Sequence, residues 1–190
     1  MKKPKPEQFS LFSPQQIKPL IETEYFVLLS PDEEIKKEVK ILKEKIQALG
    51  IECESLQSIA HISLFKTKSA DKSFPDLIEK VLFGQKKLNV KLIGTAIFEH
   101  GVKKTLYLKI ENPEPIKSLY ALLTKKSEKS FTPHITIAKN VTPEDFTKLE
   151  SIISEFNYFA DWTCENVTIL KKPLDGKAKK YDVEREIALV

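Results

Sequence analysis

The chain has 190 residues, of which 41% are hydrophobic and 31% charged, and its formal net charge is +4. This composition can build a sizeable core for one domain, and the charge favours anionic partners only mildly. No apolar run approaches the roughly 20 residues of a membrane helix, so we expect a soluble, cytoplasmic protein without membrane association.

The cysteines and histidines show no metal-ligand spacing. Cys53 and Cys164 are the only cysteines and lie far apart in the chain. They belong to no paired-ligand motif, so we predict free thiols, no metal site and no cofactor. Arg185 is the only arginine. Phosphate contacts must therefore come chiefly from lysines, hydroxyls, backbone amides or histidines.

Residues 1–21 are predicted to form a flexible N-terminal extension, because lysines and prolines dominate it. Within it, the pentapeptide Gln8–Phe12 resembles the short motif by which bacterial proteins dock on the replication sliding clamp. The alternative is that its two phenylalanines cover an apolar groove of their own domain.

From residue 22 onward the pattern predicts one domain of alternating strands and helices. We expect strands at 25–29, 56–66, 88–98, 105–110, 131–139, 162–170 and 181–189, and helices at 30–50, 75–83, 115–125 and 142–156. Ser30 and Thr142 are candidate helix caps, and Gly94 is a candidate bulge. The order strand, helix, strand, helix recurs in both halves and predicts an internal duplication.

Two of the expected strands share one motif. Both Ile59–Phe65 and Phe131–Ala138 contain histidine, isoleucine, a hydroxyl residue and an aliphatic residue in that order. A strand has a two-residue period, so His61 and Ser63 share one face, as do His134 and Thr136. Related by a pseudo-twofold axis, the halves would bring both imidazoles to one cleft, where they can serve as general base and general acid for phosphodiester chemistry.

Three neighbouring side chains have two interpretations each. Lys66 and Lys139 end the motif strands, where they either reach a phosphate or are solvated strand ends. Strand alternation places Phe65 on the His61 face, where it either stacks on a base or packs in the core.

The paired motifs resemble the two-histidine phosphoesterase superfamily, specifically its branch of RNA 2',5'-ligases and 2',3'-cyclic phosphodiesterases, over about residues 25–190. Ala60, Ser63 and Lys139 stand where proline, threonine and arginine are common in that family. The resemblance implies an α+β fold in which two antiparallel-type sheets face a central cleft, with helices on the outside. We expect a single two-lobed domain over residues 22–190, with lobes at 22–100 and 101–190 and an exchange of strands between them left open.

The resemblance also implies an activity. Family members hydrolyse RNA 2',3'-cyclic phosphate ends, usually to a 2'-phosphate and without metal, and some reversibly join 2',5' linkages. His61 and His134 would be the acid-base pair, with His134 as the base, and Ser63 and Thr136 would bind phosphate. Tyr181 would approach the cleft and could stack on a base.

Other functions stay open at this point. The chain could be a noncatalytic RNA-end binder, a clamp-associated adaptor, or a phosphodiesterase for small nucleotides. We expect a monomer whose partners are RNA ends or small nucleotide phosphodiesters.

Overall fold

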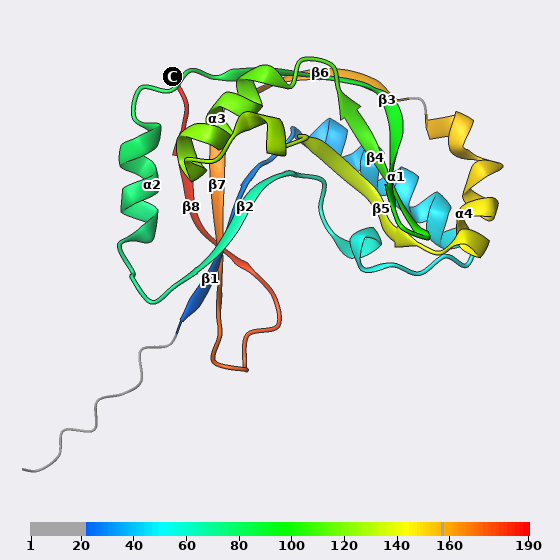
Figure 1. The fold of residues 1–190 in the computed structure, drawn as a ribbon, viewed down its shortest axis with the longest axis horizontal. Coiled ribbons are helices and arrows are strands. Elements are labelled where there is room, and N and C mark those ends of the chain that lie inside the picture. Colours follow the sequence, from blue (N-terminus) through cyan, green and yellow to red (C-terminus); the bar gives the residue numbers. More distant parts are fainter. Residues whose placement is uncertain (1–21, 157) are drawn as a thin grey trace, which may run out of the picture.

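The computed structural model describes residues 22–156 and 158–190 (Figure 1). The clamp-like motif Gln8–Phe12 and the rest of the predicted extension lie outside these residues. The strands are β1 (Thr23–Leu29), β2 (Ile62–Ser69), β3 (Leu88–His100), β4 (Lys103–Ile110), β5 (His134–Val141), β6 (Phe159–Cys164), β7 (Asn166–Pro173) and β8 (Asp182–Ala188). The helices are α1 (Glu33–Ala48), α2 (Phe74–Leu82), α3 (Glu114–Thr124) and α4 (Pro143–Glu150), with short 3-10 helices η1 (Glu54–Gln57), η2 (Glu128–Ser130) and η3 (Ile153–Phe156).

The strands form one curled antiparallel sheet of eight, in the order β6-β3-β4-β5-β2-β1-β7-β8 (Figure 1). The mixture of helices and antiparallel strands agrees with the predicted class, but the expectation of two sheets is wrong. β2 and β5 pair through Ile62 and Ile135, and this contact joins two four-stranded halves into one sheet. The two halves of the sheet do not follow the expected lobe ranges in every strand. β3 belongs to the range 22–100 but lies with β4, β5 and β6. β7 and β8 belong to the range 101–190 but lie with β1 and β2.

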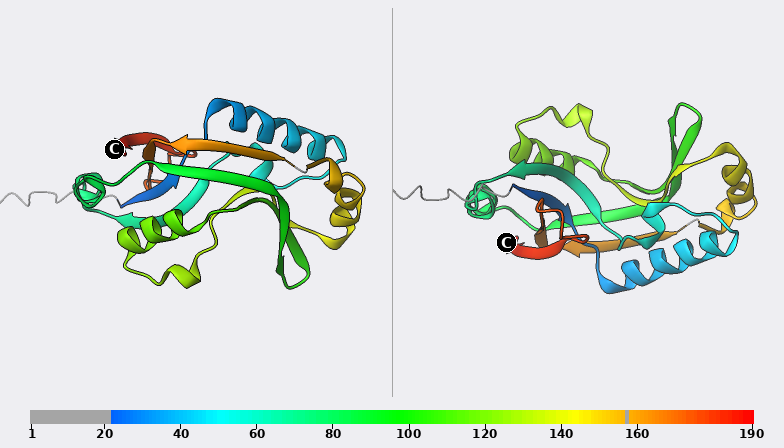
Figure 2. Two further views of the ribbon diagram at one scale, coloured as in Figure 1. Left: turned by 90° about the horizontal axis from the view of Figure 1, so that it is seen from above. Right: turned by 90° about the horizontal axis from the view of Figure 1, so that it is seen from below.

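The seam between β2 and β5 is also a centre of internal repetition. The order β1, α1, η1, β2 recurs as β4, α3, η2, β5, and β1 and β4 flank the two motif strands. The helices pack crosswise, since α1 and η1 contact β5 while α3 contacts β2. Figure 2 shows α1 and α3 on opposite sides of the molecule. Each motif strand is therefore supported by a helix from the other repeat.

Helix α1 shows how local sequence sets these elements. Its buried residues recur at helical spacing and pack into the common core: Ile35, Val39, Leu42 and Ile46. The expected cap Ser30 is not the one used, because the Asp32 carboxylate accepts a hydrogen bond from the backbone amide of Ile35 at 2.9 Å. Thr142 does cap α4, as predicted. No helix in the described ranges has both the length and the apolar composition to cross a membrane.

Two strand expectations have different outcomes. Gly94 lies at a register shift between β3 and β4 with φ of +76°, so the predicted bulge is confirmed. The single strand expected at 162–170 is instead the end of β6 and the start of β7, which lie far apart in the sheet. The chain turns at Glu165 without glycine or proline, so no local turn signal marks the break.

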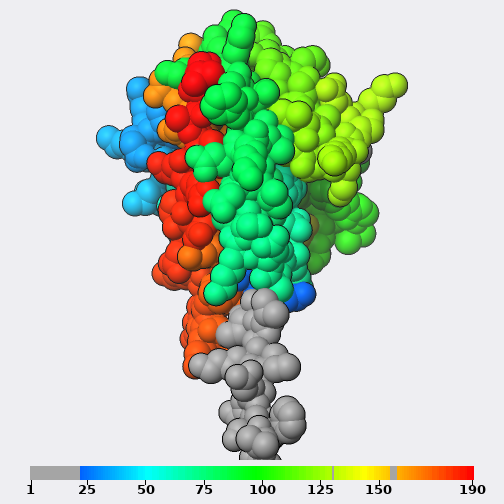
Figure 3. Space-filling view, turned by 90° about the vertical axis from the view of Figure 1, so that its left-hand side faces the viewer, coloured from blue at the N-terminus to red at the C-terminus, as the bar shows by residue number. Residues whose placement is uncertain are grey.

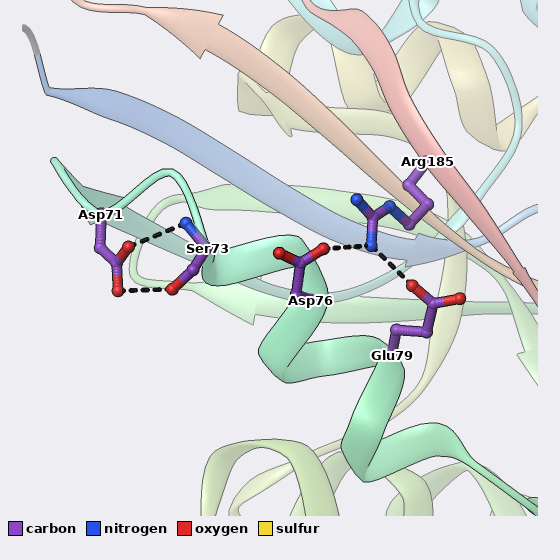
Figure 4. A network of polar contacts seen from close by, with 5 residues as sticks. All are labelled: Asp71, Ser73, Asp76, Glu79 and Arg185. Carbon is purple, nitrogen blue, oxygen red and sulfur yellow. Dashed lines mark hydrogen bonds and ion pairs between the residues drawn. The ribbon is translucent and has the colours of Figure 1, made fainter.

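The edge strand β8 holds α2 through the only arginine. The Arg185 guanidinium donates to Asp76 at 2.7 Å and to Glu79 at 2.6 Å, and in Figure 4 both carboxylates reach it from α2. At the approach to the helix, Asp71 accepts hydrogen bonds from the amide and hydroxyl of Ser73. Figure 3 shows α2 lying against β8 on the outer face of the molecule. Arg185 thus serves the fold at this edge.

Candidate active site

The two motifs meet at the seam of the sheet. Ile62 pairs with Ile135, and both side chains are fully buried in the core. In an antiparallel register, this pair sets His61 opposite Thr136 and Ser63 opposite His134. All four side chains lie on the face opposite to the isoleucines. The structure therefore gathers the imidazoles and hydroxyls of both motifs on one surface.

The imidazoles are held in the same way in both motifs. Nδ1 of His61 lies 2.7 Å from the carbonyl oxygen of Ile59, and Nδ1 of His134 lies 2.8 Å from that of Thr132. A carbonyl oxygen can only accept, so Nδ1 carries the proton in each ring. Each Nε2 is thereby left as the reactive atom, able to accept a proton from a neutral ring or donate one from a charged ring.

The surroundings of both imidazoles favour their neutral forms. Burial is the main cause that lowers the pKa of His61 and of His134, while the hydrogen bond to a backbone carbonyl partly opposes it. The positive charges of Lys43, Lys66 and His134 lower the pKa of His61 further. For His134 the added cation is Lys139. The two rings are thus close enough to influence each other electrostatically, and His61 has the more cationic surroundings.

A β-bulge in each motif strand brings a lysine to the same face. The pairing of β2 with β1 skips Leu64, and the pairing of β5 with β4 skips Ile137. Both residues stand three positions after their histidine. The inserted residue shifts the alternation by one, so Lys66 and Lys139 join their histidine and hydroxyl residue on one face. Without the bulges, both lysines would point to the opposite face.

The same bulge moves Phe65 away from its expected place. Phe65 pairs with Val27 on the core side and contacts Phe74 of α2, with ring centroids 6.5 Å apart. The ring beside His61 is instead Phe26 of β1, which meets the imidazole edge-on at 5.2 Å. Phe65 is the one predicted site residue that the structure places apart from the histidines.

Tyr181 lies beside this group, just before β8. Its ring is 5.8 Å from Phe26, and the Lys66 ammonium lies 4.5 Å from the Phe26 ring centre and 5.1 Å from the Tyr181 ring centre. The Tyr181 hydroxyl donates a hydrogen bond to Glu24, which also forms an ion pair with Lys172 at 3.2 Å. Burial and the Glu24 contact raise the pKa of Tyr181, so its hydroxyl stays protonated. Tyr181 therefore lies beside Phe26, the ring that contacts His61.

Sequence reasoning missed the aromatic residues around His134. Phe98 of β3 and Tyr107 of β4 meet its ring edge-on, at 5.0 Å and 5.2 Å, and stack on each other at 4.0 Å. Phe98 is half-buried, whereas Tyr107 is almost completely covered. No motif marks these rings, because they reach His134 from neighbouring strands. In the sequence, only the alternation of side chains along β3 and along β4 indicates the face on which each ring lies.

Two further observations define the limits of the site. A cavity of about 560 Å³ lies between α1 and residues 56–60, behind the backbone that leads to His61, and its lining includes neither motif histidine. Within residues 22–156 and 158–190, no three histidine, cysteine or carboxylate side chains come together as metal ligands. We call the surface that presents His61, Ser63, Lys66, His134, Thr136 and Lys139 the motif face. The chemistry available there is that of imidazoles, hydroxyls and lysines.

Comparisons with known proteins identify the family and the fold of the chain. The model of the 2'-5' RNA ligase superfamily matches residues 31–176. Among solved structures, E. coli LigT complexed with 3'-AMP has a TM-score of 0.61 and 13% identity, covering 90% of this chain and 99% of that chain. The protein TT0787 of Thermus thermophilus has a TM-score of 0.56 and 16% identity, covering 87% and 97%. E. coli LigT complexed with ATP has a TM-score of 0.57 and 15% identity, covering 89% and 99%. No curated protein matches the chain.

Proposed function

Because the chain belongs to the 2'-5' RNA ligase superfamily, we propose that it is a metal-independent phosphodiesterase that opens 2',3'-cyclic phosphate ends of RNA to a 2'-phosphate. Membership of this superfamily supports phosphodiester cleavage or ligation as the general chemistry. The finer proposal rests mainly on two imidazoles that share one face and keep Nε2 free. Such a pair can remove one proton and deliver another without any cofactor.

The reaction requires one proton acceptor and one proton donor. Nε2 of the base takes a proton from water as the water oxygen attacks phosphorus, and Nε2–H of the acid protonates the departing 3'-oxygen. Ser63 and Thr136 would donate hydrogen bonds to the phosphate oxygens, and Lys66 and Lys139 would balance the charge that develops there. If a 5'-hydroxyl replaces water as the nucleophile, the same sequence forms a 2',5' linkage as the 3'-oxygen departs. Attack of that 3'-hydroxyl on the linkage reverses the step, so reversible 2',5' ligation would use the same groups.

Electrostatics favours His61 as the base and His134 as the acid, the reverse of the assignment implied by the family resemblance. The base must be neutral when the reaction starts, and three cationic groups disfavour the charged form of His61. A charged His134 is one of these groups, so protonation of His134 favours a neutral His61. His134 retains its bond to Thr132 when charged, because that bond requires only Nδ1–H.

The aromatic residues near His134 provide a surface for the nucleobase. Phe98 is half-buried, and its ring stacks on the ring of Tyr107. This stacking holds the Phe98 ring in place. Bases stack on such rings with little dependence on sequence. We assign base stacking to Phe98 rather than to Phe65, which faces the core, with Tyr181 at the other side of the site.

The test is hydrolysis of an RNA oligonucleotide with a 2',3'-cyclic phosphate end in excess EDTA. His61→Ala and His134→Ala should each lower kcat by about a hundredfold or more, the scale expected when a general acid or base is lost. His100→Ala is the matched control, since His100 is the third histidine and is exposed at the end of β3.

Loss of turnover on adding EDTA, with recovery on adding zinc or manganese, would contradict the metal-free mechanism. A wild-type protein that turns over a nucleoside 2',3'-cyclic phosphate but not the oligonucleotide would shift the substrate to small nucleotides. Binding of RNA ends without turnover of either substrate would indicate the noncatalytic alternative.

A further inference from the structure

A lysine buried beneath the first motif lies outside the group of side chains that would contact the phosphate, although its charge is one of those that lower the pKa of His61. Lys43 of α1 is only 3% exposed. Its ammonium donates hydrogen bonds to the carbonyl oxygens of Ser55 and Ser58, both at 2.7 Å, and to the Ser58 hydroxyl at 3.1 Å. An ammonium has three protons, and these three oxygens are suited to receive them. Burial of a charge is costly, so its retention here calls for a role.

The segment that Lys43 holds leads directly into the first histidine. Ser58 is followed by Ile59, whose carbonyl oxygen fixes the Nδ1 of His61 at 2.7 Å. The Ile59 side chain is 73% exposed, so side-chain packing at this residue does little to fix the backbone. The hydrogen bonds from Lys43 to the two carbonyls therefore restrain the orientation of this segment, together with the buried side chains of Leu56 and Ala60.

The same segment reaches the second motif through Ser55. The Ser55 hydroxyl accepts a hydrogen bond from the amide of Lys139 at 2.8 Å and donates one to the carbonyl of Ile137 at 3.4 Å. Ile137 is the bulged residue of β5, so this hydroxyl satisfies backbone groups at the bulge. The Ser55 side chain, which belongs to the first repeat, thereby stabilises the β5 bulge that brings Lys139 to the motif face.

The contacts from Lys43 through Ser55 to β5 form a bridge between the two motifs. This bridge crosses the part of the sheet that has the fewest ladder pairs. β2 and β5 are joined by the single ladder pair of Ile62 with Ile135. The chain of contacts from Lys43 through Ser55 to β5 is a second connection between the two motifs, made by η1 against β5. Acid-base catalysis by a pair of imidazoles depends on their relative placement, and a misplacement of about 1 Å can cost a hundredfold in rate.

We propose that Lys43 and Ser55 are positioning residues that fix the two histidine motifs relative to each other, with Lys43 orienting His61 and Ser55 holding the β5 bulge. This inference rests on the proposed function for its effect on rate. It predicts that loss of either residue lowers kcat while KM for the cyclic phosphate changes little, because neither side chain belongs to the motif face.

The experiment compares Lys43→Met and Ser55→Ala with wild type in the cyclic phosphate assay. Lys43→Met keeps the apolar stem, and we expect kcat to fall by about tenfold to a hundredfold. Ser55→Ala should lower kcat by about tenfold, and Ser55→Thr should restore it because the hydroxyl is retained. Lys37→Met is the matched control, since Lys37 is exposed on the same helix. If Lys43→Met fails to fold, the two Ser55 variants decide.

NMR provides a measurement that does not depend on turnover. Ser55→Ala should shift the Lys139 amide resonance and the His134 ring resonances, although neither residue is altered. Lys43→Met should raise the pKa of His61, because one of the cations that lower it is removed. Unchanged kcat in both variants of an active enzyme would overturn the inference and leave the proposed function intact. In an inactive wild type the proposed function fails, and unperturbed Lys139 and His134 resonances would then overturn the bridge separately.

Discussion

Replacement of Lys43 by methionine should change how stability depends on pH. Burial lowers the pKa of Lys43 from 10.5 to about 8 in the folded protein. The unfolded chain therefore binds the proton more tightly, and the free energy of unfolding of the wild type should rise as pH increases from below 8 to above 10.5. Methionine has no proton to release, so this contribution is absent from Lys43→Met.

The magnitude follows from the size of the shift. The fall in the pKa from 10.5 to about 8 corresponds to about 3 kcal/mol over the whole transition. Most of this change, about 2 kcal/mol or more, should be visible between pH 7 and pH 10. The direction is a gain in stability of wild type over variant as the solution becomes more alkaline.

Urea unfolding at pH 7, 8, 9 and 10 measures this difference. Tyrosines also titrate in this range, but they do so in both proteins and cancel when the variant is subtracted from the wild type. Lys37→Met, on the exposed side of the same helix, should follow the wild type. Parallel stability profiles for wild type and Lys43→Met would refute the reasoning, because they would show that Lys43 holds its proton equally well in both states.

Three further predictions concern the motif face and the side chains beside it. Burial lowers the pKa of both motif histidines below 6.5, so kcat/KM should follow a bell-shaped pH profile with its optimum on the acid side of that value, and a flat profile from pH 5 to 9 would count against the pair. Phe98→Ala should raise KM for the RNA end by about tenfold, whereas Phe98→Tyr keeps the stacking surface and should have little effect; equal KM values in all three proteins would remove Phe98 from the site. Tyr181→Phe removes the hydrogen bond that is the largest cause of the lowered pKa of Glu24, so NMR titration should show that pKa rising, and an unchanged value would argue that Lys172 dominates.

The motif residues could be predicted from sequence because they depend on local alternation. His61 and Ser63 share one face, as do His134 and Thr136, since only one residue separates the members of each pair. The prediction fails for Phe65 at the first irregularity, because a β-bulge depends on the pairing with the neighbouring strand. A two-residue period cannot reveal an inserted residue.

Other differences have similar causes. Whether two half-sheets remain separate depends on the pair of Ile62 with Ile135, which lie 73 positions apart in the chain, and no local pattern encodes that contact. Tyr107 reaches His134 from the adjacent strand β4, and Phe98 reaches it from β3 beyond that strand, so their place beside His134 depends on the strand order. Lys43 resembles any other helical lysine in the sequence, and its burial arises from the crosswise packing of α1 and η1 against β5.

The paired bulges determine which changes in chain length the motifs can tolerate. Deletion of Leu64 would let Phe65 take the vacated core-facing position, and His61, Ser63 and Lys66 would remain on a common face. Deletion of Ile62, only two positions earlier, would instead turn the histidine and the hydroxyl to opposite faces. The third residue after each histidine is thus a position where length can vary without reversing the sides of the strand, while the residue between histidine and hydroxyl fixes the spacing of the motif.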